Sequence, residues 1–184
     1  LRMLDNGNLG IGTTAPSAPL HVYKADGWST GQNWMQWIQN EEATDDSNYG
    51  LKISAGSTGN DTSFFVQDHD ASNDYFIIRG NGNVGIGTTS PSAKLHLKSS
   101  SSNEPTLLME NTNADDSAAF LTFNKNSASP ADGDELGYIQ FKGDDSAGNS
   151  DTFADIYASA GDVTTTTEDG EMVFRNIYNG TMGQ

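Results

Sequence analysis

A seventeen-residue phrase occurs twice in this chain, first as Asn6–Val22 and again 75 residues later as Asn81–Leu97. Thirteen of the seventeen positions are identical, whereas the residues between the two copies have no counterpart of comparable likeness. Repetition of this fidelity indicates a modular array in which one structural unit recurs between variable segments. A single large core is not expected, because only 34% of the residues are hydrophobic and 20 are glycine.

The charge of the chain excludes several partners. It carries 25 acidic and 9 basic residues, a formal net charge of −16, and the acidic residues are spread along its length. Such a field repels nucleic acid, and no cluster of lysine and arginine offers a local exception. No apolar run approaches the roughly 20 residues that span a bilayer, so we expect no membrane insertion. Cysteine is absent, which removes disulfides and thiolate metal sites.

Short segments rich in aromatic and β-branched residues, bounded by Asn, Asp, Ser and Gly, predict strands along the rest of the chain. In chain order they are residues 34–39, 49–53, 62–67, 74–79, 106–111, 119–124, 136–142, 152–157 and 170–175. The one helical pattern is a single turn near residues 40–47. The fold class we predict is therefore all-β, an elongated array of short antiparallel β-modules.

The repeated phrase divides this array. Residues 1–22 hold the first copy and the end of a preceding module, and residues 23–80 form the first β-module. Residues 81–97 hold the second copy, and residues 98–184 form a second β-module. Because the next copy of the phrase is expected past Gln184, we expect the second module to be incomplete at its C-terminal end.

The phrase itself predicts a turn followed by a strand with one bare face. Asn81–Asn83 favours a tight turn with positive φ, and Val84–Gly87 then alternates apolar residues with glycine. The apolar side chains should face one side and the glycines the other, which lets another backbone approach closely. A proline then ends the pairing, and Leu95–Leu97 resumes as a strand.

Two arrangements would use such a bare strand face. One is an element of a monomeric sandwich or solenoid that recurs by duplication. The other is an intertwined parallel homotrimer, in which the strands approach the axis and three copies cover edges that modules this short and polar leave open. We predict the homotrimer.

The phrase from Asn81 to His96 resembles the recurring element of bacteriophage tail-fibre and tailspike-like proteins, many of which end in an intramolecular chaperone domain. The two copies cover 34 residues of this chain. The resemblance implies a structural segment of a trimeric virion tail fibre, extracellular, that forms a rigid β-rich shaft and contributes to host-surface attachment. The implied partners are other copies of the chain, other tail or baseplate proteins, and a host surface glycan or protein. The chaperone domain with its Ser/Lys catalytic element is not recognisable in this chain.

Two other functions remain open. Related phrases occur in large bacterial surface proteins, so a cell-surface adhesin or filament module is the first alternative. A polysaccharide-degrading tailspike is the second. Genomic neighbours would distinguish the first alternative from a tail fibre. Neighbouring tail and baseplate genes would indicate a fibre, whereas a secretion signal and a cell-wall anchor would indicate a bacterial surface protein. A loss of viscosity when the protein is incubated with capsule polysaccharide would indicate the polysaccharide-degrading tailspike.

No catalytic residues and no cofactor are predicted. The chain has three histidines, His21, His69 and His96, and two of them belong to the repeated phrase. A catalytic triad needs distinct, non-duplicated positions, and no Gly-x-Ser-x-Gly elbow is present. Asp155 with Glu171 has the residue types of a glycosidase pair, but spacing cannot select any pair from 25 acids. We therefore expect no enzyme.

No metal site is predicted either. Three copies of His21 or of His96 could meet on a trimer axis as a nitrogen site. Strand alternation instead favours packing of each histidine on the strand flank, away from the axis, because its neighbours are apolar. Asp68–Asp74 resembles a calcium-binding loop but lacks the glycine at its sixth position and the closing glutamate, so it is interpreted as a connection between two strands.

Three tryptophans are candidates for stacking on sugar rings. Trp34 and Trp37 should face opposite sides of a strand, so they cannot form one platform. Trp28, between Gly27 and Ser29, is the better exposed candidate. Packing in a core or interface is favoured over glycan contact, because a tryptophan buries a large area.

Overall fold

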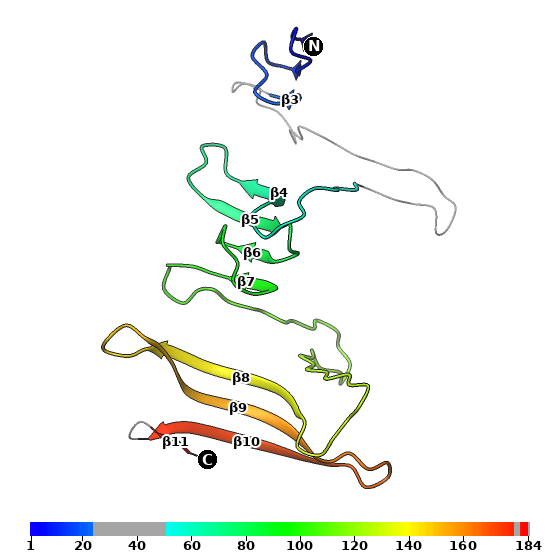
Figure 1. Ribbon diagram of the computed structural model, residues 1–184, viewed down its shortest axis with the longest axis vertical. Helices are drawn as coiled ribbons and strands as arrows, with labels where there is room; N and C mark the ends of the chain where they lie inside the picture. Colours follow the sequence, from blue (N-terminus) through cyan, green and yellow to red (C-terminus); the bar gives the residue numbers. More distant parts are fainter. Residues whose placement is uncertain (24–50, 179–180, 184) are drawn as a thin grey trace. The chain divides into compact units, whose positions relative to one another are not determined.

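The structure is a computed structural model that describes residues 1–23, 51–178 and 181–183 (Figure 1). Over these residues all regular secondary structure is β, which confirms the all-β prediction. None of the described segments forms a helix long and apolar enough to cross a membrane. The chain forms two compact units, Leu1–Thr106 and Leu107–Gln184, and each is described by itself.

Unit 1 contains two small sheets. The first comprises β1 (Arg2–Met3), β2 (Leu9–Ile11) and β3 (Leu20–Val22), and the second comprises β4 (Thr62–Gln67), β5 (Asp74–Arg79), β6 (Val84–Ile86) and β7 (Leu95–Leu97). The strands are adjacent in chain order within each sheet. Pairing is antiparallel except for β2 with β3 and β6 with β7, which are parallel. The prediction of purely antiparallel modules is therefore wrong for unit 1, where both sheets are mixed.

The parallel pair arises from the glycine at the centre of the phrase. Parallel neighbours usually need a crossover of a dozen or more residues, but only residues 87–94 join β6 to β7. This connection crosses the sheet over Gly85, where a Cβ atom would overlap the backbone carbonyl of Thr88. Gly87 lies past the end of β6 with a φ of +70°, and a Cβ there would overlap the carbonyl of Lys98.

The first copy of the phrase repeats this arrangement. Gly10 meets the carbonyl of Thr13, and Gly12, with a φ of +77°, meets that of Tyr23. The close backbone approach expected at the glycines is thus confirmed. The backbone that approaches belongs to the same chain, so the glycines do not by themselves require a trimer axis.

Unit 2 is one antiparallel sheet. Its strands are β8 (Glu135–Asp144), β9 (Ser150–Asp162), β10 (Asp169–Tyr178) and β11 (Thr181–Gly183), in the order β11-β10-β9-β8. The predictions at 136–142, 152–157 and 170–175 lie inside β8, β9 and β10 and are confirmed. In unit 1, the predicted strands 62–67 and 74–79 coincide with β4 and β5, and Val84–Ile86 and Leu95–Leu97 with β6 and β7.

Two strand predictions between β7 and β8 are wrong. Residues 106–111 and 119–124 form no strand, and large side chains such as Leu108 (75% exposed) and Phe120 (76% exposed) lie open to solvent. The pattern supplies β-forming side chains, but a strand also needs a neighbouring edge for its backbone hydrogen bonds, and these segments have none within the described residues. Residues 51–53 likewise form no strand. The predictions at 34–39, 40–47 and 49–50 lie outside the described residues.

The core is very small. Among the described residues, Ile77 and Val173 are the buried hydrophobic side chains. Ile77 in β5 stands opposite Gly85 in the pairing register, so it fills part of the space that the glycine leaves. Each unit therefore buries little apolar surface in a single chain.

We predict that Gly85→Ala destabilises unit 1 by about 1–3 kcal/mol, because the added methyl group would meet a backbone carbonyl that cannot move independently. Gly170→Ala in β10 is the matched control, since its Cβ would meet nothing closer than an oxygen of Ser159 at 3.9 Å. Hydrogen exchange at the amides of β5–β7 measures the effect locally. Equal protection in the two variants would contradict this role for Gly85.

Candidate functional site

The repeated phrase folds into the same strand–loop–strand unit twice, with the same internal hydrogen bonds. The side-chain amide of Asn83 donates to the carbonyl of Pro91 at 3.3 Å, and that of Asn8 donates to Pro16 at 3.3 Å. The strand register is also the same, with the central glycine of each unit opposite its histidine. The sequence identity between the two copies therefore maintains a local structure.

The phrase histidines have a role inside this loop. Nδ1 of His96 accepts a hydrogen bond from the backbone N–H of Ser92 at 3.3 Å, and His21 accepts one from Ser17 at 3.3 Å. A metal ion bound through Nδ1 would displace this bond. Within the described residues, no three His, Asp or Glu side chains come together as a metal site. That the two histidines point away from a trimer axis stays a prediction.

The segment that resembles a calcium-binding loop connects β4 to β5, as its interpretation as a strand connection predicted. The carboxylate of Asp68 accepts hydrogen bonds from the backbone N–H of Asn73 at 3.1 Å, from its side-chain amide at 2.6 Å and from the Ser72 hydroxyl at 2.8 Å. The backbone bond is the main cause that holds the pKa of Asp68 well below its usual range. This carboxylate closes the turn.

The two acids with the residue types of a glycosidase pair are not brought together. Glu171 stands opposite Ser159, four residues along β9 from Asp155. Four residues of strand span on the order of 13 Å, whereas glycosidase carboxyl groups lie roughly 5–9.5 Å apart. Asp155 stands opposite Arg175 instead.

Asp155 is the centre of a polar cluster on one face of unit 2. Arg175 donates to both of its carboxylate oxygens, from Nε at 2.9 Å and from Nη2 at 2.8 Å, and Asp155 is only 3% exposed. The pair raises the pKa of Arg175. The guanidinium carbon lies 4.5 Å from the ring centre of Tyr157, which stacks on Tyr138 at 5.0 Å. The hydroxyl of Tyr138 donates to Glu135 at 2.7 Å, which raises the pKa of Tyr138.

The opposite face of unit 2 is apolar and open. Ile139, Ile156 and Phe174 stand in one row across β8, β9 and β10. Phe174 is 63% exposed, and Met172 and Phe141 beside this row are also exposed. We call this surface the apolar face of unit 2.

Unit 1 also has an open apolar face, on the side opposite its crossing loop. In the second sheet, one row across β5, β6 and β7 contains Phe76, Ile86 and Leu97, and the next row contains Leu95, which is 55% exposed. In the first sheet, the corresponding residues of the phrase are Leu9, Ile11, Leu20 and Val22, and the last three are exposed. Both copies of the phrase therefore leave the same face uncovered.

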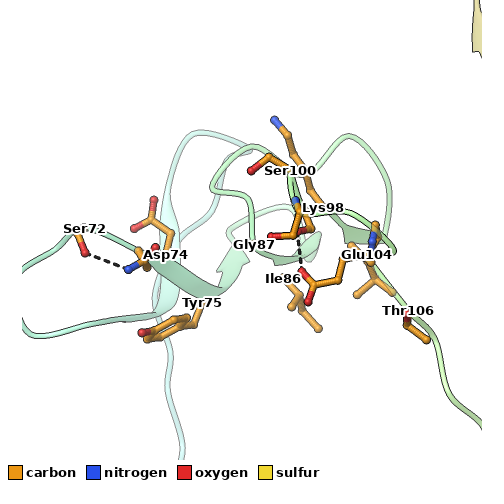
Figure 2. Close-up of a pocket in the computed structure, with 14 residues that line it drawn as sticks. Ser72, Asp74, Tyr75, Ile86, Gly87, Lys98, Ser100, Glu104 and Thr106 are labelled. Carbon is orange, nitrogen blue, oxygen red and sulfur yellow. Dashed lines mark hydrogen bonds between the residues drawn. The ribbon is translucent and has the colours of Figure 1, made fainter.

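A concave site lies at one end of the second sheet of unit 1. Its volume is about 780 Å³. Figure 2 shows Asp74 and Tyr75 at one side, Ile86 and Gly87 in the middle, and residues of the segment after β7, such as Glu104, at the other side. The pocket combines carboxylate, hydroxyl, amine and aromatic groups. The three tryptophans considered above lie outside the described residues.

Comparison with known proteins gives no assignment. No protein-family model matches the chain, and the search of curated proteins finds no significant match. The geometry of the repeated unit, of the two apolar faces and of the pocket is therefore the basis for a functional proposal.

We predict that the turn between β4 and β5 loosens as the pH falls. Because the folded pKa of Asp68 is lowered, its contribution is complete above the ordinary aspartate pKa of about 4 and is lost as the pH falls through the folded value. NMR measurement of the Ser72 and Asn73 amides from pH 7 to pH 1 follows the change. Asp68→Asn should remove this dependence, and an unchanged profile in that variant would contradict the assignment.

Proposed function

We propose that this chain is a structural segment of a trimeric bacteriophage tail fibre. It would be part of the virion, extend outside the cell as a rigid β-rich shaft and contribute to host-surface attachment. The observation that carries the proposal is that both copies of the phrase and the sheet of unit 2 leave apolar faces open in a single chain. Its partners would be two further copies, other tail or baseplate proteins, and a host surface glycan or protein.

Energetics supports an assembly of copies. A large apolar side chain gains roughly 1.5–3 kcal/mol when it becomes buried, and the net stability of a domain is only about 5–15 kcal/mol. With two buried hydrophobic residues among those described, neither unit has a core of the usual size. Copies related by rotation present the same apolar faces, so every copy in such an assembly would be covered in the same way.

The two segments that the sequence pattern wrongly predicts as strands also support an assembly of copies. Residues 107–111 and 119–124 carry exposed leucine, methionine and phenylalanine side chains. Phe123 already lies against Gly137 of β8, where a Cβ would come within 2.6 Å of the Cβ of Phe123. A neighbouring copy would supply the backbone edge that these segments lack among the described residues.

The polar features suit the outside of a fibre. The Asp155–Arg175 pair and the stacked tyrosines form a face whose hydrogen bonds are satisfied within the chain. The acidic turns are held by hydrogen bonds to their own carboxylates. In the turn Asp145–Asn149 between β8 and β9, the carboxylate of Asp145 accepts hydrogen bonds from the backbone N–H and the side-chain amide of Asn149. Such turns keep a fixed shape while facing water, and they would present variable residues to a host surface.

We predict that the chain, expressed with its natural flanking residues, has a mass in light scattering near three times 19.6 kDa plus the added residues. Phe174→Glu should reduce the mass towards that of one chain, because it places charge on the apolar face of unit 2. Glu171→Gln on the opposite face of the same strand is the control and should keep the trimer. A folded, stable monomer of the unmodified chain would contradict the trimer and favour a monomeric solenoid or a bacterial surface module.

The virion assignment is tested by immunogold electron microscopy with antibodies against this segment. We expect label on the tails of phage particles purified from the source of the chain. Label on bacterial cell surfaces, with none on particles, would instead favour the adhesin or filament alternative.

A further inference from the structure

The apolar face of unit 2 has a notch at Gly137 of β8. Gly137 stands in one row with Ala158 and Met172, and it shares its side of β8 with Ile139, because alternate residues of a strand face the same way. A Cβ atom at Gly137 would come within 2.6 Å of the Cβ and 2.8 Å of the Cγ of Phe123. Phe123 therefore occupies the space that the missing side chain leaves. One residue of the segment before β8 already lies on this face.

A hollow of about 160 Å³ lies on the apolar face beside Phe123. An apolar cavity of roughly 150 Å³ accommodates benzene, so this hollow has room for one apolar side chain. The residues around it include Phe123, Gly137, Ile139, Ile156, Ala158 and Met172.

The chain directly after Phe123 is held in place. Nζ of Lys125 lies 2.6 Å from a carboxylate oxygen of Asp134. The backbone carbonyl of Asp134 accepts a hydrogen bond from the N–H of Ala160 in β9 at 2.9 Å. Residues 125–134 are therefore tied to the sheet, which keeps Phe123 close to Gly137.

The sequence before Phe123 offers one further apolar residue for the same side. In an extended segment, residues two apart share a side, so Leu121 would face the sheet with Phe123 and Phe120 would face away. Leu121 is 61% exposed and does not line the hollow in the structure. Because Phe123 is already placed, only residues 121 and 122 must be ordered for Leu121 to reach the hollow, so the loss of conformational entropy is small.

We propose that residues 119–124 are a strap that closes over the apolar face of unit 2 of the same chain, with Phe123 as its fixed end and Leu121 as the side chain that enters the hollow. The strap covers the part of the face around Ile156 and leaves Phe174 open. A neighbouring copy would then contact Phe174 and the outer side of the strap, where Phe120 lies. The strap is inferred from unit 2 alone, whereas this contact rests on the fibre proposal.

Disulfide trapping in the full chain tests the strap, because the chain contains no cysteine of its own. One variant combines Leu121→Cys with Met172→Cys, and the matched control combines Phe120→Cys with Met172→Cys. We expect the first pair to form a bridge within one chain at least about tenfold faster, because a bridge needs Cα atoms roughly 4.4–6.8 Å apart and a side chain directed at its partner. Intact mass and mobility on a non-reducing gel measure the rates.

Equal rates in the two variants would overturn the strap. A bridge that forms only between chains would also overturn it, and would indicate that the segment of a neighbouring copy covers the face. If the double variants do not fold, nuclear Overhauser contacts between the methyl groups of Leu121 and Ala158 decide in the unmodified chain. Their presence supports the strap, and their absence overturns it.

Light scattering of the trapped and reduced protein separates this proposal from the fibre proposal. We expect the same trimer mass in both states, because the strap is closed in the assembly. A trimer that falls apart on trapping would overturn the closed strap as part of the interface. A monomer in both states, with a fast bridge within one chain, would support the strap and overturn the fibre.

Discussion

The missing side chain at the centre of the repeated strand is the constraint on which unit 1 depends. Because Gly85 has no Cβ, the backbone of Thr88 can cross directly over it, and residues 87–94 can return the chain to form a parallel neighbour. Gly10 does the same in the first copy. The crossing loop covers one face of the short strands, so the apolar side chains must lie on the other. A single steric requirement thus sets the strand direction and the position of the open face.

Unit 2 reaches a similar division by a different route. Its strands pair in antiparallel order and are joined by turns, so no crossing loop is needed, and alternation sends Asp155 and Ile156 of β9 to opposite faces. On one face, Asp155 and Arg175 satisfy each other's hydrogen bonds, and the Arg175 guanidinium lies over the ring of Tyr157. The face that carries Ile139 and Phe174 leaves both of these side chains exposed. In both units, the face that stays exposed among the described residues is apolar.

Prediction from the sequence succeeded where the pattern and the pairing partner lie close together in the chain. The strands at 62–67 and 74–79 are neighbours joined by one turn, so their pattern and their backbone partners come from the same segment. Residues 106–111 and 119–124 have an equally good pattern but no edge beside them within the described residues. The parallel pairing of β6 with β7 could not be read from alternation, which is the same for either strand direction. The pocket could not be predicted from the sequence either. Its lining residues 72–75 and 98–106 are far apart in the chain, and the pairing of β5 with β6 and of β6 with β7 brings them to the same end of the sheet.

The sequence by itself determined the all-β class, the bare glycine face, the β4–β5 connection and most of the strands, because each depends on residues within a few positions of one another. Tertiary structure alone decided that the glycines face a loop of their own chain, that His96 accepts a hydrogen bond from Ser92, and that Asp155 pairs with Arg175 twenty residues away. Those outcomes depend on the direction and register of strand pairing. Register is fixed by the fit of side chains and backbone across neighbouring strands, which the order of residues along one strand does not contain.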